Sequence, residues 1–550
     1  MTIAASHIDP PSRTDRRVGT TIGRGLIVFV LLAAARLLCA NYSYFWESDD
    51  IAIAAGVAAL VHNDDGPVYR YGPQAGYYLL VAGLDVALGS DPADIPLIMI
   101  TLSALAGAVV PALALIAFRA ELSYHERRLL GFVLFVHPNL WMSSQYGNTA
   151  TPALAFVVAA VTILSNHAGR RAVLSALALF GMGTLIRADA VLLMPLVLTM
   201  LYLKHRSLRR LTLQAGGFGG VMLGVYALLL RFDPRMDDMV STTSKHLFNA
   251  QFPTMFWEYL IWAVSPIPLL FAVWGFRDLI TNRRGRLLLY MTAWGLPVSA
   301  FYFSSTTTPR YFLLTAFPIS LCTAVGLVEF ADQLRRLARP RLVWAGLLSL
   351  SSLHMFIGLG QFTPDRFANV FRRAQIMTHD GLMYTGAFLP KALFQHGFLK
   401  KTLRSPGFGK IFDLPAAFDA HFGELAATDG PTRTVIVLLG GTSMTMFHYH
   451  AQVAGAEYTS LGEGTYFAIP YRVRLGNTEF MTVGYRTNRH VTVDEFTIEA
   501  GDEVWVRGKD MEKTMREQFP PDLDVIQIDS PLPEIQAYRC IPREEVSGAW

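Results

Sequence analysis

The sequence carries little charge. Only 16% of its 550 residues are charged, 52% are hydrophobic, and the mean hydropathy is +0.33. Soluble proteins have about 25% charged residues, so this composition excludes a disordered chain and does not fit an ordinary soluble one. The net charge of +4 is too small to indicate a protein that binds nucleic acid. A short repeating period is also missing, which excludes a solenoid or a fibre.

Cysteine is scarce as well. The chain has three cysteines, Cys39, Cys322 and Cys540, which lie far apart, two of them in apolar runs. Their spacing fits neither a disulfide framework nor a metal site. Low charge, high hydropathy and the lack of a disulfide framework or metal site together indicate a polytopic membrane protein.

What the sequence does contain is long apolar runs. A helix that crosses a bilayer needs about 20 mostly apolar residues. Such runs lie at 25–44, 95–118, 129–144, 150–166, 172–186, 190–203, 211–230, 259–276, 287–303, 311–330 and 342–360, and a weaker one lies at 73–90. The first run ends without the small residues of a cleavage site, so we expect an uncleaved helix rather than a signal peptide.

Basic residues set the expected orientation, because Lys and Arg gather in cytoplasmic loops. Five short linkers are basic: Arg119–Arg128, His167–Arg171, Lys204–Arg210, Arg277–Arg286 and Arg335–Arg341. With these linkers and the N-terminus inside, residue 46 lies outside after the first span and residue 119 lies inside. An odd number of crossings must therefore separate the two residues. The run 73–90 is interrupted by Gly76, Gly83 and Asp85, so we interpret it as a helix that lies in the outer interface. The sequence thus predicts about eleven spans, with the N-terminus inside and the C-terminus outside.

The pattern changes after residue 361, where charges return. Thr434–Leu439 is typical of a buried strand that leads through Gly440-Gly441 into a helix, and more strands are expected near Thr465–Arg474 and Glu503–Arg507. The predicted fold class is mainly α: a polytopic membrane helical bundle with a C-terminal α/β domain that faces outside. The predicted domains are a cytoplasmic tail 1–24, a membrane module 25–360 with its first outer loop and interfacial helices at 46–94, a connecting segment 361–414, and an outer domain 415–550.

This topology collects charged residues at the outer rim of the membrane. They are Glu47, Asp49, Asp50, Asp64, Asp65, Arg70, Arg187, Asp189 and Arg310. Charges beside membrane spans are costly unless they are paired or hydrated, so they mark a candidate site. The rim suits a reaction in which a charged head group is handled while its chain stays in lipid. A plain alternative is that Asp49 or Asp50 caps a helix formed by the apolar residues that follow.

Two arginines stand beside breaks between apolar runs. Arg310, in Thr308-Pro309-Arg310-Tyr311, either snorkels to the interface or binds phosphate, which suits the geometry of a guanidinium. Arg187 either pairs with Asp189 or acts as a second phosphate ligand. The residues alone leave both alternatives open.

Taken together, these motifs resemble those of the GT-C glycosyltransferases, which include the protein O-mannosyltransferases and the lipid A aminoarabinose transferases. Trp46-Glu47-Ser48-Asp49-Asp50 looks like their acidic first-loop signature, and Val68–Leu80 is similar to their Y-x-Y-P-P-x-x-Y-Y-L-L segment. His137-Pro138, Arg187 and Pro309-Arg310-Tyr311 follow in the family's order. The resemblance covers roughly residues 25–330. The chain departs from it at Asp50, where Glu is common, and at Gly72-Pro73, which replaces a Pro-Pro pair.

The resemblance implies an enzyme that moves a hexosyl or pentosyl group, with inversion, from a polyprenyl-phosphate donor to an acceptor hydroxyl on the outer side. It assigns the general base to Asp49, acceptor or substrate binding to Glu47, Asp50, Arg70 and Tyr71, and donor phosphate binding to Arg310, Arg187 and Tyr311. It leaves open whether a divalent ion, Mg or Mn, takes part, and whether the acceptor is a glycan, a lipid or a protein. A bacterial inner membrane is the expected location, with the C-terminal domain in the periplasm.

A transporter or flippase of lipid-linked saccharides is the alternative function. Transporters place functional charges near the bilayer midplane, on broken helices. Arg36 and Asp85 lie well inside apolar runs, but we place Arg36 near a helix end or facing the bundle, and Asp85 at the interface. The remaining charges gather at one rim, which favours an enzyme. A receptor-like subunit, a third interpretation, would not need the acidic first loop.

Overall fold

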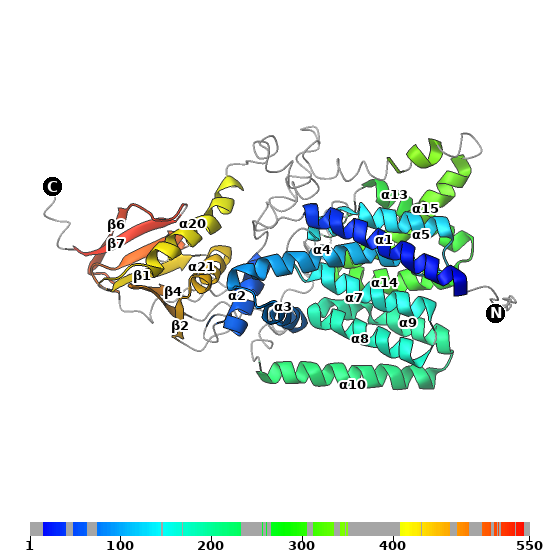
Figure 1. Ribbon diagram of the computed structural model, residues 1–550, viewed down its shortest axis with the longest axis horizontal. Coiled ribbons are helices and arrows are strands. Elements are labelled where there is room, and N and C mark those ends of the chain that lie inside the picture. Colours follow the sequence, from blue (N-terminus) through cyan, green and yellow to red (C-terminus); the bar gives the residue numbers. More distant parts are fainter. Residues whose placement is uncertain are drawn as a thin grey trace.

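The computed structural model describes residues 15–39, 48–62, 74–144, 147–167, 169–232, 266–304, 312–334, 408–430, 432–439, 441–461, 470–482, 498–507, 519–533 and 535–543, with a few shorter stretches between them. Figure 1 shows a bundle of long helices and, beyond the two helices α2 and α3, a sheet domain near the C-terminus. The predicted connecting segment 361–414 lies mostly outside the described residues.

Long apolar helices form the bundle. They are α1 (Asp15–Cys39), α4 (Ile95–Ala114), α5 (Tyr124–Phe135), α6 (Pro138–Ser143), α7 (Ala150–Asn166), α8 (Arg170–Ile186), α9 (Met194–His205), α10 (Leu208–Phe232), α13 (Pro266–Thr281), α14 (Gly285–Ser304) and α15 (Leu313–Leu334). Every strong apolar run up to residue 330 overlaps one of these helices or, for 129–144, parts of two. Within the described residues, five helical stretches are long and apolar enough to cross a membrane. The chain is an integral membrane protein with several apolar spans, as predicted, while the total of eleven stays a prediction.

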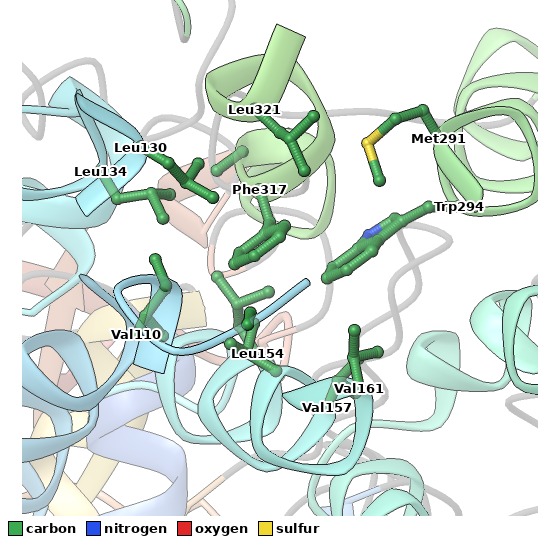
Figure 2. Close-up of a cluster of buried hydrophobic side chains, with 14 of the residues drawn as sticks. Val110, Leu130, Leu134, Leu154, Val157, Val161, Met291, Trp294, Phe317 and Leu321 are labelled. Atoms are coloured by element: carbon green, nitrogen blue, oxygen red, sulfur yellow. The ribbon is translucent and has the colours of Figure 1, made fainter. Parts of the chain in front are cut away.

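The core of the bundle is built from interdigitating apolar and small side chains. Figure 2 shows Trp294 and Phe317 at its centre, where the two rings stack with their centroids 4.8 Å apart. The Trp294 indole donates a hydrogen bond of 2.7 Å to the carbonyl of Leu314. A Cβ on Gly326 would collide with the carbonyl of Phe271, so the backbones of α13 and α15 touch. Such close contact through small residues is how membrane helices associate without a hydrophobic driving force.

Four of the five basic linkers, or the helix ends beside them, meet at one end of the bundle, and the fifth, residues 335–341, lies outside the described residues. Arg284 pairs with Glu126 at 2.5 Å, and Lys204 donates a hydrogen bond of 2.8 Å to the carbonyl of Leu164. Asn166 donates to the carbonyl of Ile116 at 2.7 Å. These contacts join the linkers at residues 119–128, 167–171, 204–210 and 277–286, which the charge pattern places on a single side.

Helices α2 (Ser48–His62) and α3 (Ala75–Leu88) lie at the opposite end. Figure 1 shows α3 nearly end-on, whereas α8 and α10 run along the picture, so α3 crosses these helices. Its 14 residues span about 21 Å, less than the roughly 30 Å of a bilayer core. A Cβ on Gly56 would lie 2.5 Å from the ring of Tyr78, which shows how closely α2 and α3 pack. The length of α3 fits the interfacial helix expected over residues 73–90, which stays a prediction.

The C-terminal domain is a seven-stranded mixed sheet in the order β2-β3-β4-β1-β5-β7-β6. Its elements are α20 (Phe408–Ala426), β1 (Arg433–Leu439), α21 (Gly441–Val453), β2 (Glu457–Ser460), β3 (Tyr471–Leu475), β4 (Thr478–Thr482), β5 (Glu503–Arg507), β6 (Leu523–Ile528) and β7 (Gln536–Pro542). The central strands β4, β1 and β5 are parallel, and antiparallel strands extend both edges. A central parallel strand is covered on both faces, which explains the uninterrupted apolar run of β1.

The predicted strand at Thr434–Leu439, the helix after it and the strand at Glu503–Arg507 are confirmed as β1, α21 and β5. The strand expected at Thr465–Arg474 begins only at Tyr471, as β3, and most of its earlier residues lie outside the described ones.

Helix α2 lies between the bundle and the C-terminal domain. Every residue from Ile51 to Ala59 is buried, and the same hydrophobic cluster continues into Phe447 and other residues of the domain. Tyr449 on α21 donates a hydrogen bond of 3.2 Å to the carbonyl of Pro92, in the short 3-10 helix η2 (Pro92–Asp94) that precedes α4. A helix that is apolar all round is one covered on all sides, and α2 is covered by α3, α4 and α21.

Candidate functional site

The acidic doublet lies in the first turn of α2. The helix begins at Ser48, so Asp49 and Asp50 lie in its first turn, and the predicted alternative that one of them caps the helix stays open. Carboxylates in a first helical turn are favoured by the helix dipole. Their side chains lie outside the described part of the chain, and so do Glu47, Arg70, Tyr71, Arg310 and Tyr311.

Arg187 is the predicted phosphate ligand whose side chain the structure describes. Helix α8 ends at Ile186, and the extended backbone of Arg187 leads into a short 3-10 helix, η3 (Ala188–Leu193). The Arg187 Nε donates to both carboxylate oxygens of Asp189, at 2.7 and 2.9 Å. The two side chains are 14% and 16% exposed. Of the two interpretations of Arg187, the structure shows the pairing with Asp189, which reduces the cost of a charge beside the membrane.

Two tyrosines lie near this pair, and one of them bonds to it. Tyr302, a buried residue of α14, donates its hydroxyl proton to Asp189, and Tyr226 of α10 donates to the carbonyl of Thr184 at 2.9 Å. We call Arg187, Asp189 and Tyr302 the arginine cluster. Sequence analysis did not identify Tyr302, because a tyrosine near the end of an apolar run is ordinary, and only the fold brings it to Asp189.

Two residues that follow predicted site residues in the sequence lie close to the arginine cluster. A Cβ on Gly76 would lie 2.7 Å from the carbonyl carbon of Leu185, so the first turn of α3 packs on the end of α8. The ring of Phe312 lies 6.3 Å from that of Tyr302. Gly76 follows the segment with Arg70 and Tyr71, and Phe312 directly follows Arg310 and Tyr311. The chain therefore approaches the arginine cluster from both of these segments.

The first turn of α2 reaches the same region through α3. The Tyr78 hydroxyl donates a hydrogen bond of 3.3 Å to the carbonyl of Ala52, three residues after Asp49. Tyr78 and Gly76 both belong to the first turn of α3. The starts of α2 and α3 and the end of α8 thus converge.

Arg36 has a structural role. It faces the bundle, one of its two expected places, and is 1% exposed. Its guanidinium donates to the carbonyls of Leu140 and Phe135, at 3.1 and 3.3 Å, and to the Ser144 hydroxyl. It also lies 4.7 Å from the ring centre of Trp141. These contacts fasten α1 to the break between α5 and α6, where carbonyls lose their helical partners.

The described residues contain no group of three or more His, Cys, Asp or Glu placed to hold a metal ion. The carboxylates of the first loop lie outside that set. The divalent ion expected there as an alternative stays a prediction.

No family model matches the chain, and no curated protein matches it either. Its structure is similar to that of ArnT from Cupriavidus metallidurans bound to undecaprenyl phosphate, with a TM-score of 0.56 and 13% identity over 95% of this chain and 98% of that one. The apo state of the same protein gives a TM-score of 0.52 with the same identity and coverage. The apo oligosaccharyltransferase from Archaeoglobus fulgidus gives only 0.44, with 11% identity over 78% of this chain and 64% of that one. The chain has the ArnT fold over nearly its whole length, which confirms the GT-C fold that its motifs predict.

Proposed function

We propose that this chain, which has the GT-C fold, is a membrane glycosyltransferase. It moves a sugar from a polyprenyl-phosphate donor to an acceptor hydroxyl at the outer rim of the membrane, with inversion. The observation that carries this proposal is the convergence of the first turns of α2 and α3 on the arginine cluster. The donor class is supported by the undecaprenyl phosphate bound in the similar structure of ArnT.

Asp49 is the proposed general base. The acceptor oxygen attacks the anomeric carbon while its proton passes to the Asp49 carboxylate, and the bond to the phosphate oxygen breaks with its electron pair. A phosphate leaves without protonation, so one carboxylate suffices, whereas inverting hydrolases need two. General-base assistance typically contributes 10²–10⁴-fold to the rate.

The departing phosphate needs positive charge, and Arg187 and Arg310, with Tyr311, are the proposed ligands. Asp189 and Tyr302 hold the Arg187 guanidinium in place, so its side chain need not be ordered when the donor binds. Glu47, Asp50, Arg70 and Tyr71 are the proposed contacts to the acceptor.

The proposed orientation puts the N-terminal tail 1–24 inside and the C-terminal domain outside, in the periplasm of a bacterial inner membrane. It rests on two contacts. Helix α2 comes directly after the first span and packs against α21 of the C-terminal domain, so both lie on one side of the membrane. The basic linkers meet at the other end of the bundle, which the positive-inside rule assigns to the cytoplasm.

A flippase is less well supported. The buried guanidinium of Arg36 fastens helices together, and the arginine cluster begins where α8 ends, at the rim that the charge pattern predicts. Transport would call for charges on broken helices in mid-membrane.

The deciding experiment uses the purified protein in liposomes with a panel of radiolabelled polyprenyl-phosphate sugars. We expect release of sugar, to water or to an added acceptor, with polyprenyl phosphate as the second product. Movement of intact donor between leaflets with no release from any member of the panel would instead establish the flippase.

A further inference from the structure

A cavity lies at the junction of the membrane bundle and the C-terminal domain, at the far end of α2 from Asp49. Its volume is about 440 Å³, and its lining includes His62 of α2, Pro92 of η2, Gln452 of α21, and Glu457, Tyr458 and Thr459 of β2. This volume falls within the 300–1,000 Å³ that is usual for sites of small ligands. We propose that the cavity binds an uncharged sugar unit of the acceptor, several units away from the hydroxyl that reacts.

Gln452 is the residue that points to a ligand. Its side chain is 6% exposed, yet neither its amide oxygen nor its amide nitrogen has a hydrogen-bond partner among the described residues. Buried polar groups are nearly always paired, and each exception needs an explanation. A primary amide offers one acceptor and two donor hydrogens, which together match adjacent hydroxyl groups of a sugar.

A second polar group at the cavity is held by a hydrogen bond. His62 Nε2 lies 2.8 Å from Asp85 Oδ2, and the Asp85 side chain is fully buried. The other carboxylate oxygen of Asp85 has no partner among the described residues. This pair joins the last turns of α2 and α3, and it holds the His62 ring rigidly at the cavity wall.

The charges around the cavity favour a neutral ligand. Neither arginine nor lysine occurs among its described lining residues, and Glu457 contributes a carboxylate. Phosphate binding relies on guanidinium or ammonium groups, so this cavity differs in kind from the arginine cluster. Hydroxyl groups, which both donate and accept, suit a lining of amide, imidazole and carboxylate.

The position on α2 determines which part of the acceptor binds here. Asp49 and His62 stand 13 positions apart on one helix, which corresponds to about 20 Å at 1.5 Å per residue. A single sugar ring cannot touch both. The assignment to the acceptor rests on the proposed glycosyltransferase function, whereas sugar binding by the cavity can be tested without it.

The first arm of the experiment measures binding. The full-length protein in nanodiscs is mixed with maltotriose, cellotriose, mannotriose or N,N′,N″-triacetylchitotriose, and saturation-transfer NMR detects contact. We expect at least one trisaccharide to bind the wild type, and Gln452→Leu and Thr459→Trp to weaken its affinity by roughly fivefold or more, as for loss of a hydrogen bond and blockage of the entrance. Gln527→Leu, at an exposed glutamine of β6, is the matched control and should bind normally.

Stability separates a binding role from a structural one. Replacing an unpaired buried amide by an apolar group of similar shape should leave the melting temperature of Gln452→Leu unchanged or raise it. Thr459 is exposed, so Thr459→Trp should fold normally. No binding of any trisaccharide, equal binding by Gln452→Leu, or binding of inorganic phosphate in place of sugar would overturn the proposal.

The second arm measures turnover. With the acceptor that the wild type uses, Gln452→Leu should raise the KM for acceptor while release of sugar to water stays within about twofold of wild type. Unchanged acceptor KM would refute the assignment to the acceptor. Absence of any donor turnover by the wild type would refute the glycosyltransferase instead, and the binding arm would still decide whether the cavity takes sugar.

Discussion

Asp189 should act in catalysis only through Arg187, and a double-mutant cycle tests this. Arg187→Ala removes a charge that stabilises the departing phosphate, and we expect kcat/KM for the donor to fall about 100-fold. Asp189→Asn keeps the shape but removes the negative partner of Nε, so we expect about a tenfold loss, as for one charge-assisted hydrogen bond. In the Arg187→Ala background, Asp189→Asn should lower kcat/KM for the donor no further. The assay is the initial rate of sugar release from labelled donor.

Stability provides the matched control for this cycle. The Arg187–Asp189 pair is 14% and 16% exposed, and the Arg284–Glu126 pair at the other end of the bundle is 23% and 8% exposed. Breaking either pair should destabilise the protein by about 1–3 kcal/mol, less than the cost for a fully buried pair. Arg284→Ala should therefore lower the melting temperature as Arg187→Ala does, yet leave donor kinetics unchanged. Additive losses in the cycle, or equal kinetic losses in both arginine variants, would refute the reasoning.

Three further predictions concern stability. Arg36→Met should destabilise the protein by about 3 kcal/mol, because it strands buried carbonyls of α5 and α6; an unchanged melting temperature would contradict this. Gly326→Ala should destabilise the protein by about 1–3 kcal/mol, because it forces α13 and α15 apart. At Gly295 a Cβ would meet nothing outside its own stretch of helix, so Gly295→Ala should be neutral or slightly stabilising, and thermal unfolding compares the two variants. Burial lowers the pKa of His448 to about 3, so the folded state excludes a proton that the unfolded chain binds below pH 6.5. The C-terminal domain should lose stability as the pH falls from about 6.5 toward 3, by up to about 1.4 kcal/mol per pH unit. Hydrogen exchange in α21 should show less of this loss in His448→Gln.

The apolar runs predicted most of the architecture because the bilayer imposes a single rule, about 20 apolar residues for each crossing. A continuous apolar run also predicted β1, whose central position in the sheet demands apolar residues on both faces. An alternating run predicted β5. Edge strand β6 was missed because its side chains are half exposed and carry no clear alternation.

The contacts within the site were harder to predict, because they join residues far apart in the chain. The charge pattern predicted that Arg187 lies at the outer rim, and its own loop suggested the pairing with Asp189. Tyr302 reaches Asp189 across 113 positions, a contact that no local pattern encodes. The pair of His62 and Asp85 was missed for the same reason, since it depends on how α2 and α3 pack.

The central claim is that the Asp49 carboxylate takes the proton of the acceptor hydroxyl. The most direct measurement is single-turnover transfer from the best labelled donor by wild type, Asp49→Asn and Asp91→Asn. Asp91 is an exposed residue before η2, and an asparagine there keeps a helix cap, so this variant makes the same change of charge away from the site. We predict a 10²–10⁴-fold loss in Asp49→Asn, with full activity in Asp91→Asn. Transfer by Asp49→Asn at the wild-type rate would contradict the account.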